Sequence, residues 1–366
     1  MNTNAPTKTS SFRNHRLLYI SKRKDAASTR YRIFQFFPAL ENKGWHCDYI
    51  ATNQQSLWER LQFAIACRHY SVVIIQRKLF DSFTLHLISF FNANIVFDYD
   101  DAIFLNDNGN PSSRRLKRFN KITHLAKASL AGNTYLASHS QSKLIEVLPT
   151  SIPFEDYQKK QHIREQYLNS KLADKSKYKS LTLVWIGSHS TKKYLESHRE
   201  VIEAIGEKIG NVTFKIIGDF SITFNHINTL CIDWSADTEI EELMTADIGI
   251  APMDEDPWTK GKCALKIIQY MACGLPVISS NTGANAEIVV QESSDITAIE
   301  NSAAEFKDTG FLANDLPEWI NSIEKLSNET LRLSMGANAL KRVAENYTVD
   351  KQAARMDKLF KQLVDS

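Results

Sequence analysis

The sequence has few of the features that mark a secreted or membrane-spanning protein. Its five cysteines are widely spaced, odd in number and form no CxxC pair, which indicates a reducing compartment and excludes a disulfide scaffold or a CxxC zinc site. The polar N-terminus lacks the apolar core of a signal peptide. No apolar run reaches the roughly 18 residues that a membrane-spanning helix needs. We expect a cytoplasmic protein.

Strong net charge and dinucleotide-binding motifs are missing as well. The formal net charge is only +2, so nucleic acid is not an expected partner. No GxGxxG motif follows a predicted strand, which disfavours a dinucleotide-dependent dehydrogenase. What remains is the composition of an ordinary globular protein, 43% hydrophobic and 23% charged, whose 366 residues favour two domains.

Short apolar runs alternate with helical patterns in both halves of the chain. Strands are predicted at 16–21, 47–52, 72–76, 94–98, 130–133 and 144–148, and again at 181–186, 213–217, 227–232, 248–251, 276–279 and 310–312. Helices are predicted between them, among others at 29–43, 113–127, 192–209 and 262–273. This alternation predicts an α/β fold of two Rossmann-like, doubly wound domains that face each other across a cleft.

The most informative stretch, 260–279, is predicted to form a helix, a tight turn and a buried strand. Lys262, Lys266 and Gln269 follow one another at i, i+4 and i+7, which predicts that they share one helix face. Two ammonium groups and an amide near a helix start suit an anionic ligand, because free N–H groups and the helix dipole add to the attraction. The alternative is a solvated lysine face on an ordinary helix.

Four segments carry a resemblance to a known family. The segment 271–277, MACGLPV, resembles a signature of the retaining GT-B glycosyltransferases of the family-4 type, the glycosyl transferases group 1. Upstream, 246–253 (ADIGIAPM) resembles a strand of that family. Downstream, 283–289 (GANAEIV) resembles its turn and helix, and 310–312 (GFL) a later strand. Their order is that of the family's donor-binding domain, so the resemblance implies a GT-B fold.

The domain boundaries are predicted from this resemblance and from composition. Residues 1–15 are expected to be disordered and 156–180, which is polar and rich in lysine, to be a linker. An N-terminal acceptor-side domain is predicted at 16–155 and a donor domain at 181–345. The last segment, 346–366, is predicted to be a helix that crosses back to the N-terminal domain.

The resemblance implies a donor site in the C-terminal domain. The loop after the strand at 181–186 would hold the diphosphate, and here it offers Gly187, Ser188, Ser190, Lys192 and Lys193. The alternative is a plain helix start capped by Ser190 or Thr191. Trp234 is a candidate for stacking on the base, or else a core aromatic. The donor candidates are completed by Lys262, Lys266, Gln269 and Glu287.

The chain departs from the family at a pair of glutamates. The two positions fall at Gly261 and Gln269, so neither glutamate is present. The second glutamate of the family binds the donor ribose, a task that the amide of Gln269 can partly perform. The first lies near the donor sugar. The absence of both glutamates motivates an alternative function as a non-catalytic nucleotide-sugar-binding subunit.

The N-terminal domain offers two groups of acceptor-side candidates. The turn with Ser28, Thr29, Arg30 and Arg32 resembles one that faces the cleft in a branch of the family, and two arginines suit a phosphate or carboxylate; exposed arginines at a helix N-cap are the alternative. After the strand at 94–98, Asp100 and Asp101 crowd together. Crowded carboxylates indicate a function, either an acceptor contact or a general base, whereas the alternative makes Asp101 a helix cap.

A basic segment lies in the same half of the chain. From residue 108 to 145 the sequence contains no Asp or Glu. Apolar residues recur there at helical spacing, which indicates a basic amphipathic helix on an anionic membrane surface. The predicted membrane-facing residues are Arg114, Arg115, Arg118 and Lys121. The alternative is a surface helix whose apolar side packs on its own sheet.

These patterns together indicate an enzyme that moves a sugar from a nucleotide-diphosphate donor to an acceptor hydroxyl. By resemblance it retains the anomeric configuration and acts in surface polysaccharide or glycolipid assembly, with a glycan or lipid-linked acceptor. The catalytic candidates are Asp100, Asp101 and Lys266. No cofactor and no metal are expected, and the protein would lie in the cytoplasm or on the inner face of the membrane. A GT-B sugar epimerase, which shares the fold, is a further alternative.

Overall fold

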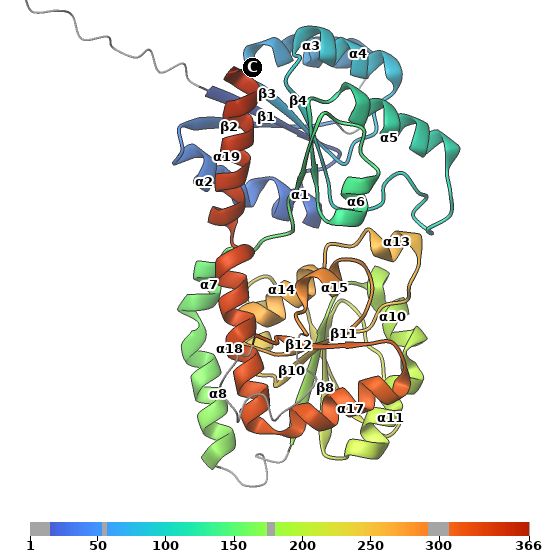
Figure 1. The fold of residues 1–366 in the computed structure, drawn as a ribbon, viewed down its shortest axis with the longest axis vertical. Helices are drawn as coiled ribbons and strands as arrows, with labels where there is room; N and C mark the ends of the chain where they lie inside the picture. Colours follow the sequence, from blue (N-terminus) through green and yellow to red (C-terminus); the bar gives the residue numbers. More distant parts are fainter. Residues whose placement is uncertain (1–14, 53–56, 174–179, 292–306, 366) are drawn as a thin grey trace, which may run out of the picture.

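The computed structural model describes residues 15–52, 57–173, 180–291 and 307–365, and it shows two α/β domains arranged along the long axis of the molecule (Figure 1). Each domain is built on a six-stranded sheet, and every strand pairing in the two sheets is parallel. Parallel neighbours need crossover connections, which the helices supply. The predicted fold class, two Rossmann-like domains in a GT-B arrangement, is confirmed.

The N-terminal sheet has the strand order β2-β1-β3-β4-β5-β6. Alternate residues of β1 enter two different cores, because side chains of a strand point to opposite faces: Leu18 and Ile20 pack on one side, and Leu17 and Tyr19 on the other. Its strands are β1 (His15–Ser21), β2 (Trp45–Ala51), β3 (Val72–Gln76), β4 (Ile95–Tyr99), β5 (Ala128–Ala131) and β6 (Leu144–Val147). Its helices are α1 (Ala27–Arg32), η1 (Phe34–Phe36), α2 (Phe37–Glu41), α3 (Leu57–Ala66), η2 (Cys67–His69), α4 (Ser82–Phe91), α5 (Ser113–Leu125) and α6 (Thr134–Ser138).

The C-terminal sheet has the order β12-β11-β10-β7-β8-β9. Its strands are β7 (Leu181–Ile186), β8 (Val212–Gly218), β9 (Asn228–Asp233), β10 (Ile248–Ala251), β11 (Val277–Ser280) and β12 (Gly310–Ala313). The helices around it are α7 (Phe154–Lys159), α8 (Gln161–Ala173), η3 (His189–Thr191), α10 (Lys192–Ser197), α11 (Arg199–Ile209), α12 (Glu239–Met244), α13 (Pro257–Lys260), α14 (Leu265–Ala272), α15 (Gly283–Ile288), α17 (Leu316–Ser327) and α18 (Glu329–Asn346).

Three predicted helices are divided or shortened. The helix predicted at 192–209 divides into α10 and α11. The helix predicted at 29–43 divides into α1, η1 and α2, because Ile33 leaves the helical region at φ −127° and Pro38 has no N–H to continue the ladder. The helix predicted at 262–273 begins only at Leu265, since Ala264 adopts a left-handed conformation with φ 51°. That late start places Lys262 before the helix, so the prediction that it shares a face with Lys266 and Gln269 is wrong.

The segment 156–180, predicted to be a linker, contains most of α7 and all of α8. Helix α8 packs on the C-terminal domain through two buried cations. Arg164 donates to the carbonyl oxygens of Met244 and Ala246, and Lys171 Nζ lies 2.6 Å from Asp247 Oδ2. The sequence shows these residues as an ordinary charged stretch, so only the fold reveals that their partners are buried.

The last two helices tie the domains together. Helix α18 lies along the C-terminal domain, and α19 (Val349–Asp365) continues along the N-terminal domain (Figure 1), where Phe360 packs against Trp45. Between the domains the two crossings of the chain lie side by side. Ile152 donates to the carbonyl of Tyr347 at 3.0 Å, and Val349 donates to the carbonyl of Ile152 at 3.1 Å.

Some predictions fall on other parts of the chain. Residues 1–14, most of the predicted disordered N-terminus, lie outside the described residues, as do residues 292–306 of the predicted donor domain. Within the part of the chain that the structure describes, none of the helices combines the length and apolar character needed to cross a membrane.

Candidate functional site

The loop after β7 brings a compact turn and the start of a helix to the carboxyl edge of the C-terminal sheet. Gly187 is required there, because a Cβ at this position would lie 2.4 Å from the ring of Trp185. The chain then forms η3 and α10, with the hydroxyls of Ser188 and Ser190 2.9 Å apart. Thr191 precedes α10 without a capping side-chain hydrogen bond, so the capped-helix alternative is wrong. Free N–H groups at a helix start attract anions.

The two lysines of this loop point in different directions. Lys192 is half-buried, with its Nζ 5.5 Å from the ring centroid of Phe220 and 3.5 Å from Glu196 Oε1. Lys193 is exposed and lies over the ring of Tyr194. Both remain near the start of α10, so either ammonium group adds positive charge to the turn.

Lys266 occupies the first turn of α14 beside this loop. Its Nζ lies 4.0 Å from the ring centroid of Trp185, and among the described residues no carboxylate forms an ion pair with it. Burial, followed by the nearby charge of Lys262, lowers the pKa of Lys266 to about 7. Burial disfavours the charged form of an ammonium group that has no ion-pair partner, and a bound anion would stabilise the charged form.

Lys262 has a different environment, at the junction of the two domains. Its Nζ lies 2.7 Å from Asp101 Oδ1, and the other oxygen of Asp101 lies 2.5 Å from Arg77 Nη2. Asp101 is therefore held between two cations, and no helix begins at this turn, so the helix-cap alternative is wrong. Arg77 also lies 3.4 Å from Asp100; the sequence reasoning missed it, although it directly follows β3 at a left-handed φ of 55°.

The neighbouring carboxylate, Asp100, is less well satisfied. Its Oδ1 atom is buried and has no hydrogen-bond partner, while its backbone carbonyl accepts from Cys263 Sγ at 3.2 Å. This oxygen lies 3.4 Å from Arg77 Nη1, an ion pair without hydrogen-bond geometry, and a buried carboxylate oxygen that lacks a hydrogen bond is costly. Asp100 is thus the member of the acidic pair with capacity left for a ligand.

Gly261 explains why a glutamate is missing from this chain. A Cβ on Gly261 would lie 2.7 Å from both the backbone nitrogen and the Cβ of Ala102. The N-terminal domain approaches so closely that no larger side chain fits. Asn133 strengthens the same contact, donating to the carbonyl oxygens of Lys260 and Lys262 at 2.9 Å each.

Three other donor candidates lie around this junction. Gln269 is only 4% exposed and lies near the buried hydroxyl of Tyr157, and its burial limits its access to a ligand. The carboxylate of Glu287 accepts a hydrogen bond from Thr134 of the N-terminal domain. Trp234 is 44% exposed, which excludes the core-aromatic alternative.

Trp234 lies where the two domains face each other. Its Nε1 donates to Glu239 Oε2 at 2.7 Å, and the guanidinium of Arg30 lies 5.7 Å from its ring centroid. Arg30 also donates to the hydroxyl of Tyr31 at 2.7 Å. The distance from Arg30 to the ring of Trp234 corresponds to a cation–π contact, which brings an aromatic face and a guanidinium from opposite domains together.

The other residues of the Ser28–Arg32 turn differ from the prediction. Arg32 is 1% exposed and forms a buried ion pair with Asp98, with its Nη1 donating to the carbonyl of Leu148 at 2.6 Å. Thr29 is buried and donates to the carbonyl of Arg23. Neither faces a ligand. Ser28 is half-buried, so Arg30 and Ser28 remain as candidates in this turn.

Helix α5 carries the predicted membrane-facing residues. Phe119 and Ile122 are buried in the N-terminal core, as the alternative of a helix packed on its own sheet requires. Arg115 bonds the carbonyl of Leu105 and the carboxylate of Asp107, both at 2.7 Å, and Arg118 donates to the carbonyl of Leu79 at 3.4 Å. Arg114 is exposed and Lys121 half-buried. Phe119 and Ile122 are therefore not available to lipid, whereas Leu116 is 42% exposed.

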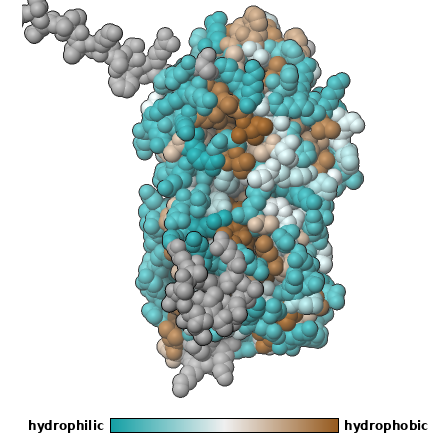
Figure 2. All heavy atoms as spheres, in the orientation of Figure 1, coloured by the Kyte–Doolittle hydropathy of each residue, from teal (hydrophilic) through white to brown (hydrophobic). Residues whose placement is uncertain are grey.

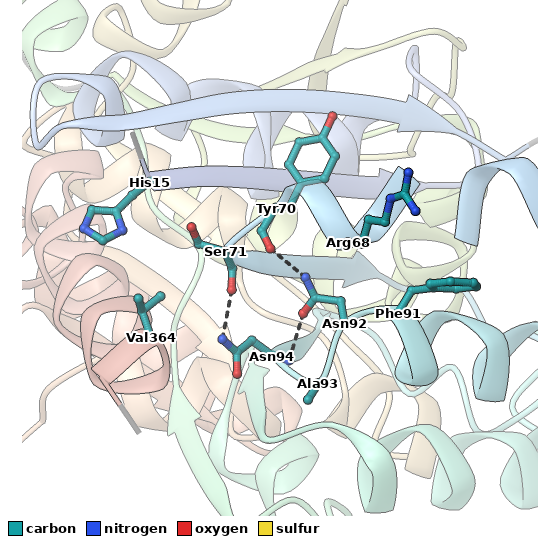
Figure 3. A pocket seen from close by; sticks show the side chains of 9 residues that line it. All are labelled: His15, Arg68, Tyr70, Ser71, Phe91, Asn92, Ala93, Asn94 and Val364. Atoms are coloured by element: carbon teal, nitrogen blue, oxygen red, sulfur yellow. Dashed lines mark hydrogen bonds between the residues drawn. The ribbon is translucent and has the colours of Figure 1, made fainter. Parts of the chain in front are cut away.

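A separate pocket of about 330 Å³ lies at the opposite edge of the N-terminal sheet (Figure 3). Residues near the starts of β1, β3 and β4 line this pocket. Its side-chain amides are already hydrogen-bonded, because Asn94 donates to the carbonyl of Ser71 and Asn92 to that of Tyr70. Ligands of such sheets bind outside the carboxyl ends of the strands, so this pocket is not the candidate site. Among the described residues no group of three or more His, Cys, Asp or Glu could hold a metal ion.

Comparison with known proteins identifies one of the two domains. Residues 180–328 match the family model of glycosyl transferases group 1. The C-terminal domain is therefore similar to the glycosyl transferases group 1. The match spans β7 to α17 and includes the loop at Gly187, Lys262 and Lys266.

Solved structures share the fold of the whole chain. HepE from Anabaena, in complex with UDP and glucose, is 15% identical, with a TM-score of 0.63 over 95% of this chain and 100% of that one. A glycosyltransferase from Rickettsia africae is 12% identical, with a TM-score of 0.67 over 97% and 100%. The catalytic domain of starch synthase IV from Arabidopsis thaliana is 11% identical, with a TM-score of 0.62 over 96% and 99%. These identities show the GT-B fold alone. None of the curated proteins matches the sequence.

Proposed function

We propose that this glycosyltransferase moves a sugar from a nucleoside-diphosphate donor to an acceptor hydroxyl. The observation that carries the proposal is Lys266, a half-buried ammonium without an ion-pair partner among the described residues, beside the glycine-opened loop at Gly187. Together they form a positive site at the carboxyl edge of the sheet, where ligands of this fold class bind. The HepE structures, which contain UDP or UDP-glucose, support this donor class.

The proposed reaction needs charge stabilisation more than it needs a metal or a cofactor. The bond between the anomeric carbon and the diphosphate oxygen breaks, and the nucleoside diphosphate leaves with the bonding electrons. The acceptor oxygen bonds to the anomeric carbon and releases its proton. Lys266 and the N–H groups at the starts of α10 and α14 would stabilise the departing charge, the kind of preorganised electrostatic effect that dominates such catalysis.

The donor is proposed to span the domain boundary. Its base would lie near Trp234 and Arg30, whose ring and guanidinium face each other across the boundary. Its diphosphate would lie at Ser188, Ser190, Lys192 or Lys193, and Lys266. Asp100, whose Oδ1 has no hydrogen-bond partner, would contact the donor sugar or the acceptor hydroxyl. Retention of configuration and a role in surface polysaccharide or glycolipid assembly follow by resemblance only.

The acceptor is proposed to be a glycan or a lipid-linked molecule. The basic character of the N-terminal domain supports an acceptor at an anionic membrane surface, because 108–145 contains no Asp or Glu. Helix α5 would supply charge to such a surface. It would not supply an anchor, since Phe119 and Ile122 are buried.

A two-stage experiment tests the function. Thermal-shift measurements with a panel of nucleotide sugars should find a donor that raises the apparent melting temperature. Incubation with that donor and candidate acceptors should then release nucleoside diphosphate and form a glycoside. Binding of a nucleotide sugar without release of nucleoside diphosphate would favour a non-catalytic subunit. The lack of space for a glutamate at Gly261 supports that alternative. Release of nucleotide without net transfer of sugar would favour an epimerase or hydrolase.

A further inference from the structure

Three large aromatic side chains are exposed on two adjacent helices of the N-terminal domain. Trp58 in the first turn of α3 is 68% exposed, and Phe83 and Phe90 of α4 are 64% and 81% exposed. Phe83 and Phe90 are seven residues apart, so they share one face of α4. Figure 2 shows apolar side chains at the end of the molecule where Figure 1 places α3 and α4. We call Trp58, Phe83 and Phe90 the aromatic surface.

The first turns of the two helices lie together. Arg60 of α3 lies 3.1 Å from Asp81, which caps α4. At the other ends of the helices, Asn92 donates to the carbonyl of Cys67 at 2.9 Å. The helices therefore run side by side in the same direction. This arrangement brings Trp58 and Phe83 to the same end of the pair.

Positive charges border the aromatic surface. Arg118 of α5 donates to the carbonyl of Leu79, three residues before α4. The pKa of Lys78 is lowered by burial and then by the charges of Lys22, Arg60 and Arg118, so these four cations gather at one place. Of the two carboxylates in these first turns, Asp81 is paired with Arg60, and Glu59 is the other. The border keeps a net positive charge.

We propose that the aromatic surface and its cationic border dock on an anionic lipid bilayer. Tryptophan and phenylalanine rings insert at the boundary between headgroups and acyl chains, while neighbouring lysines and arginines attract the anionic headgroups. Charge favours this occupant over a second copy of the chain. A second copy would bring a surface with the same positive border, whereas an anionic bilayer supplies the opposite charge.

The location suits delivery of an acceptor from the membrane, a consequence that rests on the proposed function. Lys22 follows β1 and Lys78 follows β3, so both lie at the carboxyl edge of the N-terminal sheet. Arg77 and Asp101 lie at the same edge. A bilayer held at the first turns of α3 and α4 would lie on the side of the N-terminal domain that carries this edge. Docking itself does not depend on which sugar is transferred.

Sedimentation with vesicles tests the proposal. Full-length protein is mixed with phosphatidylcholine vesicles, with or without phosphatidylglycerol, at low and high salt. The variant Trp58→Ser/Phe83→Ser/Phe90→Ser should lower the partition coefficient on anionic vesicles by about 100-fold, because three rings no longer leave water. A matched variant, Leu172→Ser/Leu230→Ser/Leu333→Ser, removes exposed apolar side chains from the C-terminal domain and from α8, which packs on it. It should change the partition coefficient less than about twofold.

The outcomes separate docking from the transferase function. Wild-type protein that pellets equally little with all vesicles would overturn the proposal. So would an unchanged partition coefficient in the aromatic variant, or a wild-type dimer that this variant dissociates. The thermal shift produced by UDP serves as an independent readout of the folded donor site, and it should be equal in all three proteins. Vesicle binding without any nucleotide response would leave docking standing and remove the donor assignment.

Discussion

Two lysines four residues apart, Lys262 and Lys266, have opposite electrostatic situations. Lys262 lies before α14 and has its charge matched by Asp101 at 2.7 Å. Lys266 lies within the helix, over the indole of Trp185, with no ion-pair partner among the described residues. The unpaired group is the better anion ligand, because binding does not have to break an existing pair first.

We expect Lys266→Met to weaken donor binding by about 2–3 kcal/mol, the scale of one charge-assisted contact. Methionine keeps an aliphatic stem over Trp185. Because the pKa of Lys266 is about 7 in the free protein, binding of a diphosphate near pH 8 should also take up a proton. Titration calorimetry in two buffers of different ionisation enthalpy measures this uptake. Lys208→Met, at an exposed position of helix α11, is the control. Equal proton uptake in wild type and Lys266→Met would contradict the assignment of Lys266 to the diphosphate site.

The same pKa shift predicts an effect on stability. The pKa of Lys266 falls from 10.5 to about 7 on folding. The contribution of Lys266 to the free energy of unfolding is therefore fully present above pH 10.5 and is lost as the pH falls toward 7. The charged form therefore destabilises the fold at low pH. We expect Lys266→Met to have a higher melting temperature than wild type at pH 6, with a smaller difference near pH 10. A lower melting temperature at pH 6 would show that Lys266 has a structural partner.

A third residue-scale prediction concerns the buried pair of Arg32 and Asp98. Both side chains are almost fully buried, and removing one partner leaves an uncompensated charge. We expect Arg32→Met to lower the free energy of unfolding by about 3–5 kcal/mol, measured by urea denaturation. Arg16→Met, which breaks a partly exposed pair with Asp48, should cost about 0–1 kcal/mol. Similar losses in both variants would argue against a buried ion pair.

Among the secondary-structure elements, the start of α14 determines where Lys262 and Lys266 lie. Ala264 precedes the helix in a left-handed conformation, which a residue with a Cβ adopts only at a cost. Strain of this kind persists where the surrounding structure imposes it, often at functional sites. Here the surrounding structure includes the N-terminal domain, which contacts Gly261 and Cys263.

We expect Ala264→Gly to stabilise the protein by about 1 kcal/mol, because glycine adopts positive φ without a steric penalty. The comparison variant is Ala339→Gly in the middle of α18, where glycine should cost at least about 1 kcal/mol. Thermal unfolding followed by circular dichroism distinguishes the two. If both variants lose stability to the same extent, the left-handed conformation of Ala264 is not the origin of the late helix start.

At the scale of the whole molecule, the structure holds the domains together by contacts between 100–134 and 260–287. Lys262 pairs with Asp101, Asn133 donates to two carbonyls of the opposite domain, and Thr134 donates to Glu287. These contacts lie beside the proposed diphosphate site. Rearranging the domains would therefore change the environment of Lys262.

We expect Asp101→Asn to lower turnover at least tenfold, the scale of a misplaced reacting group, while donor affinity stays the same or increases. The reason is that Lys262, once released from Asp101, gains freedom to contact the diphosphate. Steady-state kinetics combined with equilibrium donor binding measures both effects. Asp107→Asn, which removes an exposed carboxylate paired with Arg115, is the control. A parallel loss of turnover and donor affinity would place Asp101 in the donor site instead.

The sequence by itself determined the strand–helix alternation, and with it the class of fold. β3, β7 and β10 have the bounds predicted for them, because buried parallel strands are short apolar runs between polar turns. Local chemistry also marked the glycine-opened loop at Gly187 and the acidic turn at Asp100. Periodicity could identify these features because each depends on a few neighbouring residues.

Only the tertiary structure decided which charged residues have partners. Arg32 and Lys171 are as basic in sequence as Arg30 and Lys266, yet buried carboxylates from distant segments occupy the first two. The partners are 66 and 76 residues away, and no local pattern records such distances. The closeness of Ala102 to Gly261, which leaves no room for a glutamate, likewise depends on how the two domains meet. Electrostatic environment is a property of the assembled fold, and it separates the free cations of the site from the structural ones.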